Sequence, residues 1–139
     1  MNADKTDALQ DTSPADPQPY PEQELTGQIL SCAFAVHNTL GAGFLERVYG
    51  NALAVELRKQ SLECSQELPL KITYRGAVVG DYVADLVVGG KVLIEMKACA
   101  VLDANHCAQI MNYLRASGIR VGLLLNFGRP KLEWRRFVC

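Results

Sequence analysis

The stretch VADLVVGGKVLIEMKA, residues 83–98, contains two apolar runs separated by a pair of glycines. Apolar runs on either side of Gly89-Gly90 are typical of a β-hairpin. Three charged residues interrupt them: Asp85 in the first run, and Glu95 and Lys97 in the second. Because side chains alternate along a strand, residues 95 and 97 point to the same face of the sheet. A buried charge is costly unless it is paired or bound, so the pattern indicates either a functional site or an exposed ion pair.

The length of the turn decides whether Asp85 lies on the same face as Glu95. In a strict two-residue loop, residue 85 lies opposite residue 94, and the two acids point to opposite faces. In a three-residue loop, or with one bulge, residues 85 and 95 share a face. The second register also gives a wholly apolar opposite face, so we favour it. That face consists of Leu86, Val92, Ile94 and Met96.

Helices are predicted on both sides of the hairpin. Apolar residues recur at helical spacing in residues 22–41 and 43–62. Asp103 and Gly118 are suitable caps for a third helix over residues 103–118. In the second helix, the apolar positions predict one buried side, formed by Leu45, Val48, Ala52 and Val55.

Further strands are predicted over residues 64–75, 119–128 and 132–138. Pro69 indicates an edge strand or a bulge in the first of these. The resulting order, α-α-β-β-β-α-β-β, predicts an α/β fold with a mixed β-sheet flanked by helices. We expect residues 23–139 to form a single domain.

The composition argues against several classes of protein. Residues 1–22 are rich in Pro, Asp, Gln, Ser and Thr and are predicted to be a flexible tail without the features of a secretory signal. The longest apolar run, residues 26–40, is too short for a membrane span. The formal net charge of −1 gives no general attraction to nucleic acid. Five scattered cysteines without a Cys-x-x-Cys pair indicate free thiols in a reducing cytoplasm.

Two carboxylates on one face repel each other, so either one is protonated or a cation neutralises them. Mg²⁺ takes oxygen ligands and often uses only one or two protein carboxylates. A neighbouring lysine can orient or deprotonate a water molecule, or stabilise the charge of a phosphate. The combination of Asp85, Glu95 and Lys97 therefore suits the hydrolysis of a phosphodiester.

The pattern Asp85-x9-Glu95-x-Lys97 resembles that of the PD-(D/E)XK nuclease superfamily, with an alanine in place of the frequent proline before the aspartate. The stretch GFLERVY, residues 43–49, resembles the motif of the GxxExxY family, small bacterial proteins placed in that superfamily. The resemblance extends through about residues 24–138. It implies a restriction-endonuclease-like core and nuclease architecture, with DNA or RNA as the partner.

The resemblance also implies roles for five residues. Asp85 and Glu95 correspond to the metal-binding acids, and Lys97 to the lysine of the E-x-K pair. Glu46 corresponds to an acid on the first core helix that contacts the metal directly or through water. Gln109 falls where related nucleases often place a polar active-site residue. The implied cofactor is Mg²⁺ or Mn²⁺, held by Asp85, Glu95 and Glu46.

Several residues have a second interpretation. Glu46 could instead cap its helix or pair with Arg47 or Lys97. Tyr49 could hold a carboxylate by a hydrogen bond. His37 is better explained as a helix cap than as a catalytic group.

Alternatives to catalysis also stay open. The chain could be a module of the same fold that binds nucleic acid or a protein partner without cutting it. It could also act as a homodimer, since small nucleases of this superfamily often pair. The basic residues Lys131, Arg135 and Arg136 form either a phosphate-contacting stripe or a solvated strand face.

Overall fold

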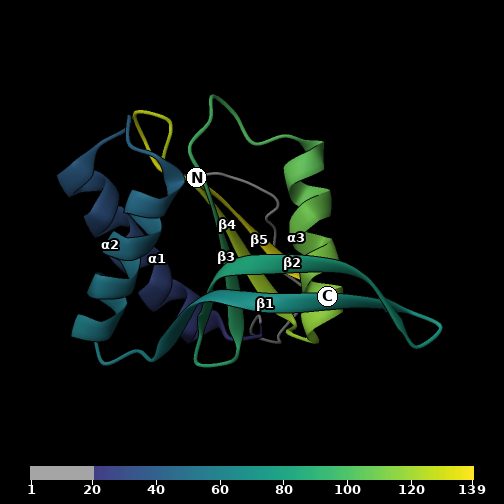
Figure 1. The fold of residues 1–139 in the computed structure, drawn as a ribbon. Helices are drawn as coiled ribbons and strands as arrows, with labels where there is room; N and C mark the ends of the chain where they lie inside the picture. Colours follow the sequence, from purple (N-terminus) through teal and green to yellow (C-terminus); the bar gives the residue numbers. More distant parts are fainter. Residues whose placement is uncertain (1–20) are drawn as a thin grey trace, which may run out of the picture.

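A computed structural model describes residues 21–139, which form three helices and five strands in the predicted order (Figure 1). The elements are α1 (Gln23–Leu40), α2 (Glu46–Lys59), β1 (Cys64–Tyr74), β2 (Ala77–Val88), β3 (Val92–Lys97), α3 (Ala104–Ser117), β4 (Val121–Asn126) and β5 (Glu133–Val138). The predicted tail falls almost entirely outside the described residues. No helix within residues 21–139 combines the length and the apolar character needed to cross a bilayer.

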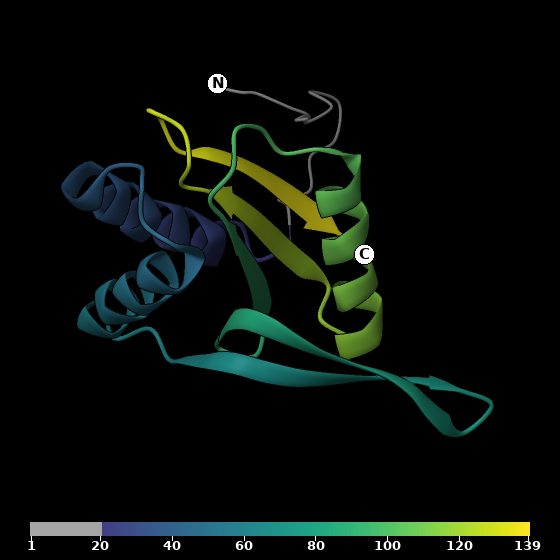
Figure 2. The ribbon, with the colours of Figure 1, turned by 45° about the horizontal axis from the view of Figure 1, so that its top comes forward.

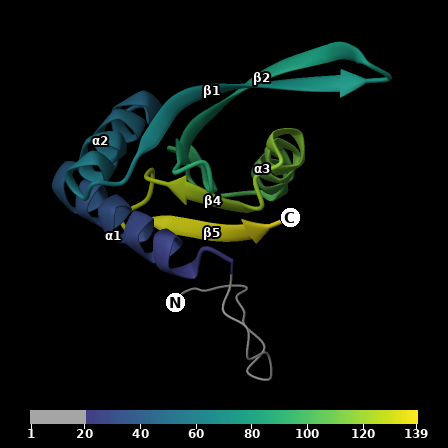
Figure 3. The ribbon, with the colours of Figure 1, turned by 90° about the horizontal axis from the view of Figure 1, so that it is seen from below.

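The strands form one mixed sheet in the order β1-β2-β3-β4-β5. Neighbouring strands are antiparallel, except that β3 and β4 are parallel and are connected through α3. Figure 3 shows α1 and α2 on one face of the sheet and α3 on the other. The predicted α/β fold, a mixed sheet flanked by helices, is confirmed. β1 is an edge strand, as Pro69 indicated.

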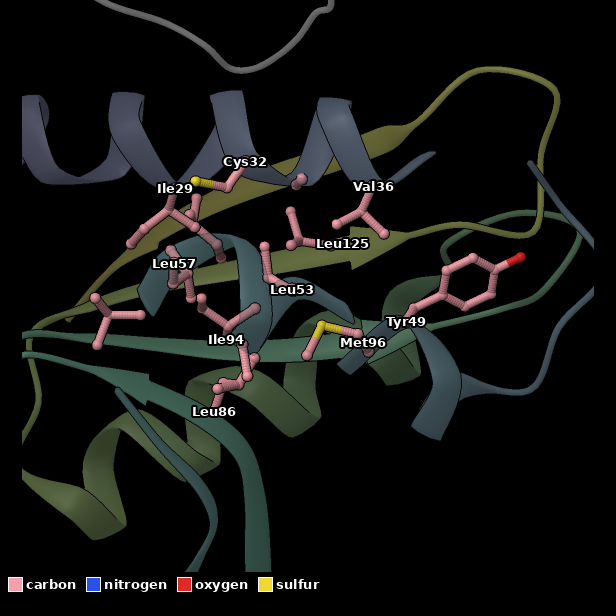
Figure 4. Packing of buried hydrophobic residues seen from close by; sticks show 14 of the residues in the cluster. Ile29, Cys32, Val36, Tyr49, Leu53, Leu57, Leu86, Ile94, Met96 and Leu125 are labelled. Carbon is pink, nitrogen blue, oxygen red and sulfur yellow. The ribbon is translucent and has the colours of Figure 1, made fainter. Parts of the chain in front are cut away.

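The larger core lies between the sheet and the pair formed by α1 and α2 (Figure 4). Ile29 of α1 and Leu53 and Leu57 of α2 are fully buried in it. The sheet contributes Leu86, Val88, Val92, Ile94, Met96, Val121, Leu123 and Leu125. This is the apolar face that favoured the longer turn between β2 and β3, so the core itself stabilises that register.

The buried side of α2 is not the predicted one. Leu45 and Val55 are 80% and 53% exposed, whereas Tyr49, Leu53 and Leu57 are fully buried. Apolar residues occur around most of this helix, so their spacing is compatible with more than one buried side. The side that packs carries the larger side chains, which remove more apolar surface from water.

A second apolar cluster lies between α3 and the opposite face of the sheet. Ile110 of α3 is fully buried there, against Gly122 of β4: a Cβ on this glycine would lie 3.0 Å from the Cδ1 atom of Ile110. The helix has the predicted ends. Asp103 accepts a hydrogen bond from the backbone N–H of His106, and Gly118 ends the helix with a φ of 75°.

Candidate functional site

The turn between β2 and β3 consists of residues 89–91, because Val88 pairs with Val92. Val87 then pairs with Leu93, and Leu86 with Ile94. The next residue on each strand is an acid, so Asp85 and Glu95 lie opposite each other. The register that we favoured from the sequence is confirmed.

The side chains of β2 change faces at Asp85. Leu86 packs in the core of α1 and α2, whereas Ala84, two residues earlier, packs in the α3 cluster. Residues two apart on a regular strand share a face, so the chain rotates by roughly half a turn between them. Pairing between β2 and β3 ends at Leu86 and Ile94. The two acids therefore lie where the two strands separate.

The carboxylates replace the strand pairing that is lost there. Oε2 of Glu95 accepts a hydrogen bond of 2.9 Å from the backbone N–H of Asp85. Oδ2 of Asp85 accepts one of 2.8 Å from the backbone N–H of Met96. Buried N–H groups need a partner, so both acids contribute to folding. Within residues 21–139, no donor bonds the remaining oxygens, Oε1 of Glu95 and Oδ1 of Asp85.

Burial makes both acids hard to ionise. Glu95 is 4% exposed, and burial, followed by the charge of Asp85, raises the pKa of Glu95 from 4.5 to about 8. Burial also raises the pKa of Asp85, and the charges of Glu46 and Glu67 add to that rise. The positive charge of Lys97 lowers the pKa of both acids without cancelling the effect of burial. The pair therefore retains a proton near neutral pH or accepts a cation.

A further acid, Glu67, lies beside this pair and was not expected from the sequence. The pairing of its two neighbours places it opposite Asp85 on β1. Its φ of 55° is left-handed, which is uncommon for a residue other than glycine. Its Oε2 lies 3.8 Å from Nη2 of Arg47, at the start of α2. The only signal for this irregularity in the sequence is Pro69, two residues later.

Lys97 is held beside the acids by α3. Its Nζ donates a hydrogen bond of 2.8 Å to Oε1 of Gln109. Nε2 of Gln109 in turn donates one of 3.2 Å to the hydroxyl of Tyr113. The ring of Tyr113 lies 5.5 Å from that of Tyr82, three residues before Asp85. Gln109 therefore contacts the lysine directly, and a chain of contacts links both to β2.

Glu46 is less closely associated with the other acids. It is the first residue of α2, it is exposed, and it lines a cleft of about 560 Å³ with Arg47, Ala98 and Gly128. Its charge acts on Asp85, but no hydrogen bond joins the two. In the part of the chain that the structure describes, no three acids, histidines or cysteines form a ready-made metal site. A metal-binding role for Glu46 stays a prediction.

The stretch that resembles the GxxExxY motif is organised by Tyr49. Its hydroxyl donates a hydrogen bond of 2.5 Å to the backbone oxygen of Gly41 and accepts one of 3.1 Å from the N–H of Phe44. Its ring stacks on Phe127, with centroids 4.5 Å apart. The interpretation that Tyr49 holds a carboxylate is therefore wrong. It holds the loop between α1 and α2, and so positions Glu46.

The loop after Lys97 is fastened to the loop after β4. The amide of Asn126, which is fully buried, bonds both the N–H and the carbonyl of Cys99, each at 3.0 Å. Gly128 packs against the same segment: a Cβ there would lie 2.4 Å from the nitrogen of Cys99. These contacts determine the path of the backbone as it leaves the site.

Two other interpretations need correction. Nε2 of His37 donates a 2.8 Å hydrogen bond to the backbone oxygen of Arg129, so its ring joins α1 to the loop after β4 and caps no helix. Arg135 reaches a cysteine of α3, and Arg136 a threonine of α1. These two arginines lie on opposite faces of β5 and form no common stripe.

The donor set suits a hard divalent cation. Asp85 and Glu95 each have one carboxylate oxygen outside the hydrogen bonds to the backbone. Mg²⁺ and Mn²⁺ bind such oxygens, with water in the other positions. A cation between the two acids would also offset the repulsion that disfavours their ionised forms. These two residues are therefore the ones that would hold it.

Solved structures include two that align with most of this chain. The crystal structure of SSO0001 aligns with a TM-score of 0.53 and 19% sequence identity, over 84% of this chain and 59% of that one. This chain therefore spans about three fifths of SSO0001. An alkaline exonuclease from Laribacter hongkongensis aligns with a TM-score of 0.41 and 12% identity, over 87% of this chain and 72% of that one.

At the level of sequence, no curated protein matches this chain. A profile of the PD-(D/E)XK nuclease superfamily matches residues 23–137, which include β2, β3 and their three charged residues. Members of that superfamily generally use divalent metals. The match covers most of the chain, and the fold agrees with it, so this chain belongs to the PD-(D/E)XK nuclease superfamily.

Proposed function

We propose that this protein is a divalent-metal-dependent nuclease that hydrolyses phosphodiester bonds in DNA or RNA. The observation that carries the proposal is the pairing of the buried Glu95 with the half-buried Asp85 on the neighbouring strand, next to Lys97. A fold places two acids in this position at a cost in free energy, and binding of a cation offsets that cost. Membership of the nuclease superfamily supports phosphodiester hydrolysis as the reaction.

Each residue has a distinct role in this proposal. Asp85 and Glu95 would hold Mg²⁺ or Mn²⁺, which would supply charge neutralisation at the phosphate. Lys97 orients the attacking water or stabilises the negative charge that develops on the phosphate. Gln109 positions the amine of Lys97 through its 2.8 Å hydrogen bond. Glu46, which lines the neighbouring cleft, would support the cation directly or through water.

The first test is cleavage of single-stranded DNA, duplex DNA and RNA in Mg²⁺ or Mn²⁺, together with calorimetry of cation binding. The informative variants are Asp85→Asn and Lys97→Ala. Asparagine retains an oxygen that can accept the hydrogen bond from Met96, so the fold is preserved while the charge is lost. Lys91→Ala is the matched control, because Lys91 is an exposed lysine of the same hairpin.

We expect Asp85→Asn to abolish cation binding and cleavage. Lys97→Ala should retain cation binding and lose cleavage by about a hundredfold or more. Cleavage at the wild-type rate by both variants would refute the assignment.

The second candidate function is a module that binds nucleic acid or a protein without cutting it. The exposed position of Glu46, outside hydrogen-bonding contact with the acid pair, favours this alternative. Cation binding without cleavage of any substrate, together with retained affinity for nucleic acid in Asp85→Asn, would support it.

Two finer assignments belong to the same proposal. The loop held by Tyr49 supports placement within the GxxExxY family. The five cysteines, none of which forms a disulfide, support a reducing cytoplasm as the setting.

A further inference from the structure

The cleft that Glu46 lines is formed by three loops next to the candidate site. Figure 2 shows the loop between α1 and α2, the loop after β3 and the loop after β4 gathered at one end of the sheet. They line the cleft with residues 43–47, Ala98 and Gly128. Ala98 directly follows Lys97, and the charge of Glu46 acts on both acids of the pair. A ligand in this cleft would therefore adjoin the acids and the lysine.

Two apolar side chains in the cleft are exposed to solvent. Phe44 is 47% exposed and Leu45 is 80% exposed. Leu45 is also the N-cap of α2, where its side chain bonds no N–H group of the helix. Leucine is among the poorest N-cap residues, and its exposure contributes no apolar burial. The fold gains nothing from Leu45, so a ligand explains this residue better than stability does.

The ring of Phe44 is held in place by Tyr49. The backbone N–H of Phe44 donates a hydrogen bond of 3.1 Å to the hydroxyl of Tyr49. The two rings meet at 74°, with centroids 6.1 Å apart, and the ring of Tyr49 is itself stacked on Phe127. About half of the Phe44 side chain remains open while its backbone is fixed, so a ligand that stacks on it orders little that is not already ordered.

The charges around the cleft favour a polyanion with flat apolar groups. Arg47 lines the cleft with a side chain that is 77% exposed, although it lies 3.8 Å from Glu67. Arg129 is exposed directly after Gly128, and its Nη1 atom donates a 3.3 Å hydrogen bond to the backbone oxygen of Ala100. Cations beside an exposed aromatic ring are typical of sites for single-stranded nucleic acid, in which bases stack and phosphates are attracted.

A single strand fits this surface better than a duplex. In a duplex the bases stack on one another and most protein contacts are made to phosphate and sugar, so Phe44 and Leu45 would face a charged backbone. In a single strand the bases turn outward and stack on aromatic side chains.

We infer that the cleft binds an unpaired base, stacked on Phe44 and flanked by Leu45, and that the substrate class of the site is single-stranded nucleic acid. The inference rests on the proposed nuclease function and names the form of its substrate. DNA and RNA carry the same kind of aromatic base, so the cleft accepts either.

The test is fluorescence anisotropy of the full chain with a labelled strand of about 12 nucleotides, as DNA and as RNA. The same length of duplex and a strand with abasic sites are the comparison ligands. Binding is measured in EDTA and, for Lys97→Ala, also in Mg²⁺. The intact single strand should bind more tightly than the duplex or the abasic strand.

Phe44→Ala should weaken binding of the single strand by about fivefold or more, whereas Phe44→Trp should retain it. Affinity for the abasic strand should be unchanged in Phe44→Ala, since that strand has no base to stack. Phe34→Ala is the matched control, because Phe34 is 42% exposed but lies on α1, outside the residues that line the cleft.

Leu45→Ser separates binding from folding. Serine is a preferred N-cap, so this variant should melt at a higher temperature than the wild type. It should nevertheless bind the single strand more weakly, because the base loses an apolar neighbour. A loss of affinity in a more stable protein is not explained by misfolding.

The inference and the nuclease proposal fail in different ways. Loss of single-strand affinity in Phe44→Ala without cleavage by the wild type would support the inference and refute the nuclease proposal. Cleavage by the wild type, with normal single-strand affinity in Phe44→Ala, would overturn the inference alone. It would also be overturned by equal dependence of duplex binding on Phe44, by an equally impaired Phe34→Ala variant, or by a wild type that binds no single strand under either condition.

Discussion

Oε2 of Glu95 accepts a hydrogen bond from the backbone N–H of Asp85, while Oδ2 of Asp85 accepts one from the next residue after Glu95. The two acids thus close the gap at which β2 and β3 separate. They are at once part of the sheet and the best candidates for holding a cation. This double role leads to predictions about stability as well as activity.

The stability of the metal-free protein should fall as pH rises from about 5 to about 8. Burial raises the pKa of Glu95 to about 8 in the folded chain, from 4.5. Between these values the folded state binds more protons than the unfolded state, so raising the pH favours unfolding, by on the order of a few kcal/mol in total. Chemical denaturation across this range measures the effect. Glu95→Gln should flatten the profile, whereas Glu63→Gln, at an exposed acid, should leave it unchanged.

Mg²⁺ or Mn²⁺ should raise the melting temperature more at pH 8 than at pH 6. A cation competes with the proton that the pair retains at lower pH, so its apparent affinity rises with pH. A cation at a hundred times its dissociation constant stabilises by about 2.7 kcal/mol. Differential scanning calorimetry with and without EDTA measures the shift. An equal shift in Asp85→Asn would place the cation elsewhere.

Glu67→Gly should retain the fold, and Glu67→Val should lose stability. The φ of 55° at this position suits glycine, whereas a β-branched residue is strained there by about 1–3 kcal/mol. Urea unfolding of the two variants gives the comparison. Equal stabilities would show that the left-handed conformation is not required.

Tyr49→Phe should destabilise the protein by about 1–3 kcal/mol, because the hydroxyl bonds both Gly41 and Phe44. The stacking on Phe127 survives the change, so the effect isolates the hydroxyl group. Tyr74→Phe, at the exposed end of β1, should change stability by less than about 0.5 kcal/mol. If the nuclease proposal holds, Tyr49→Phe should also reduce cleavage, since α2 and Glu46 lose their anchor.

Gly128→Ala should be among the most damaging single changes, at about 3 kcal/mol or more, because the added Cβ meets the backbone of Cys99 at 2.4 Å. Gly27→Ala is the matched control. Gly27 lies within α1 with nothing within 4 Å of an added Cβ, so the change should stabilise by about 0.5–1 kcal/mol. Urea unfolding distinguishes the two. A Gly128→Ala variant of wild-type stability would contradict the close approach.

The sequence predicted what depends on local pattern. The order of the elements, the caps at Asp103 and Gly118, and the shared face of Asp85 and Glu95 all follow from spacing and turn length. It could not predict which side of α2 is buried, because apolar residues surround that helix. The buried side of α2 is determined by how its side chains pack against the apolar face of the sheet.

The missed features depend on contacts between segments far apart in the chain. Glu67 lies beside Asp85 because of the pairing between β1 and β2 and its left-handed backbone conformation, and no sequence motif marks it. Tyr49 has the chemistry to bind a carboxylate, but its partners are backbone atoms of the preceding loop. Periodicity is a local property, and these pairings are set only when the layers pack.

The hydrogen bonds from the backbone to Asp85 and Glu95 bear on how relatives should be judged for activity. A related protein that had lost catalysis would still be under selection to retain both acids, because backbone N–H groups of β2 and β3 would lose their partners without them. Their persistence in a sequence is therefore poor evidence of a working enzyme. Lys97, whose amine bonds a side chain and no backbone group, is the position at which loss of catalysis would first become visible.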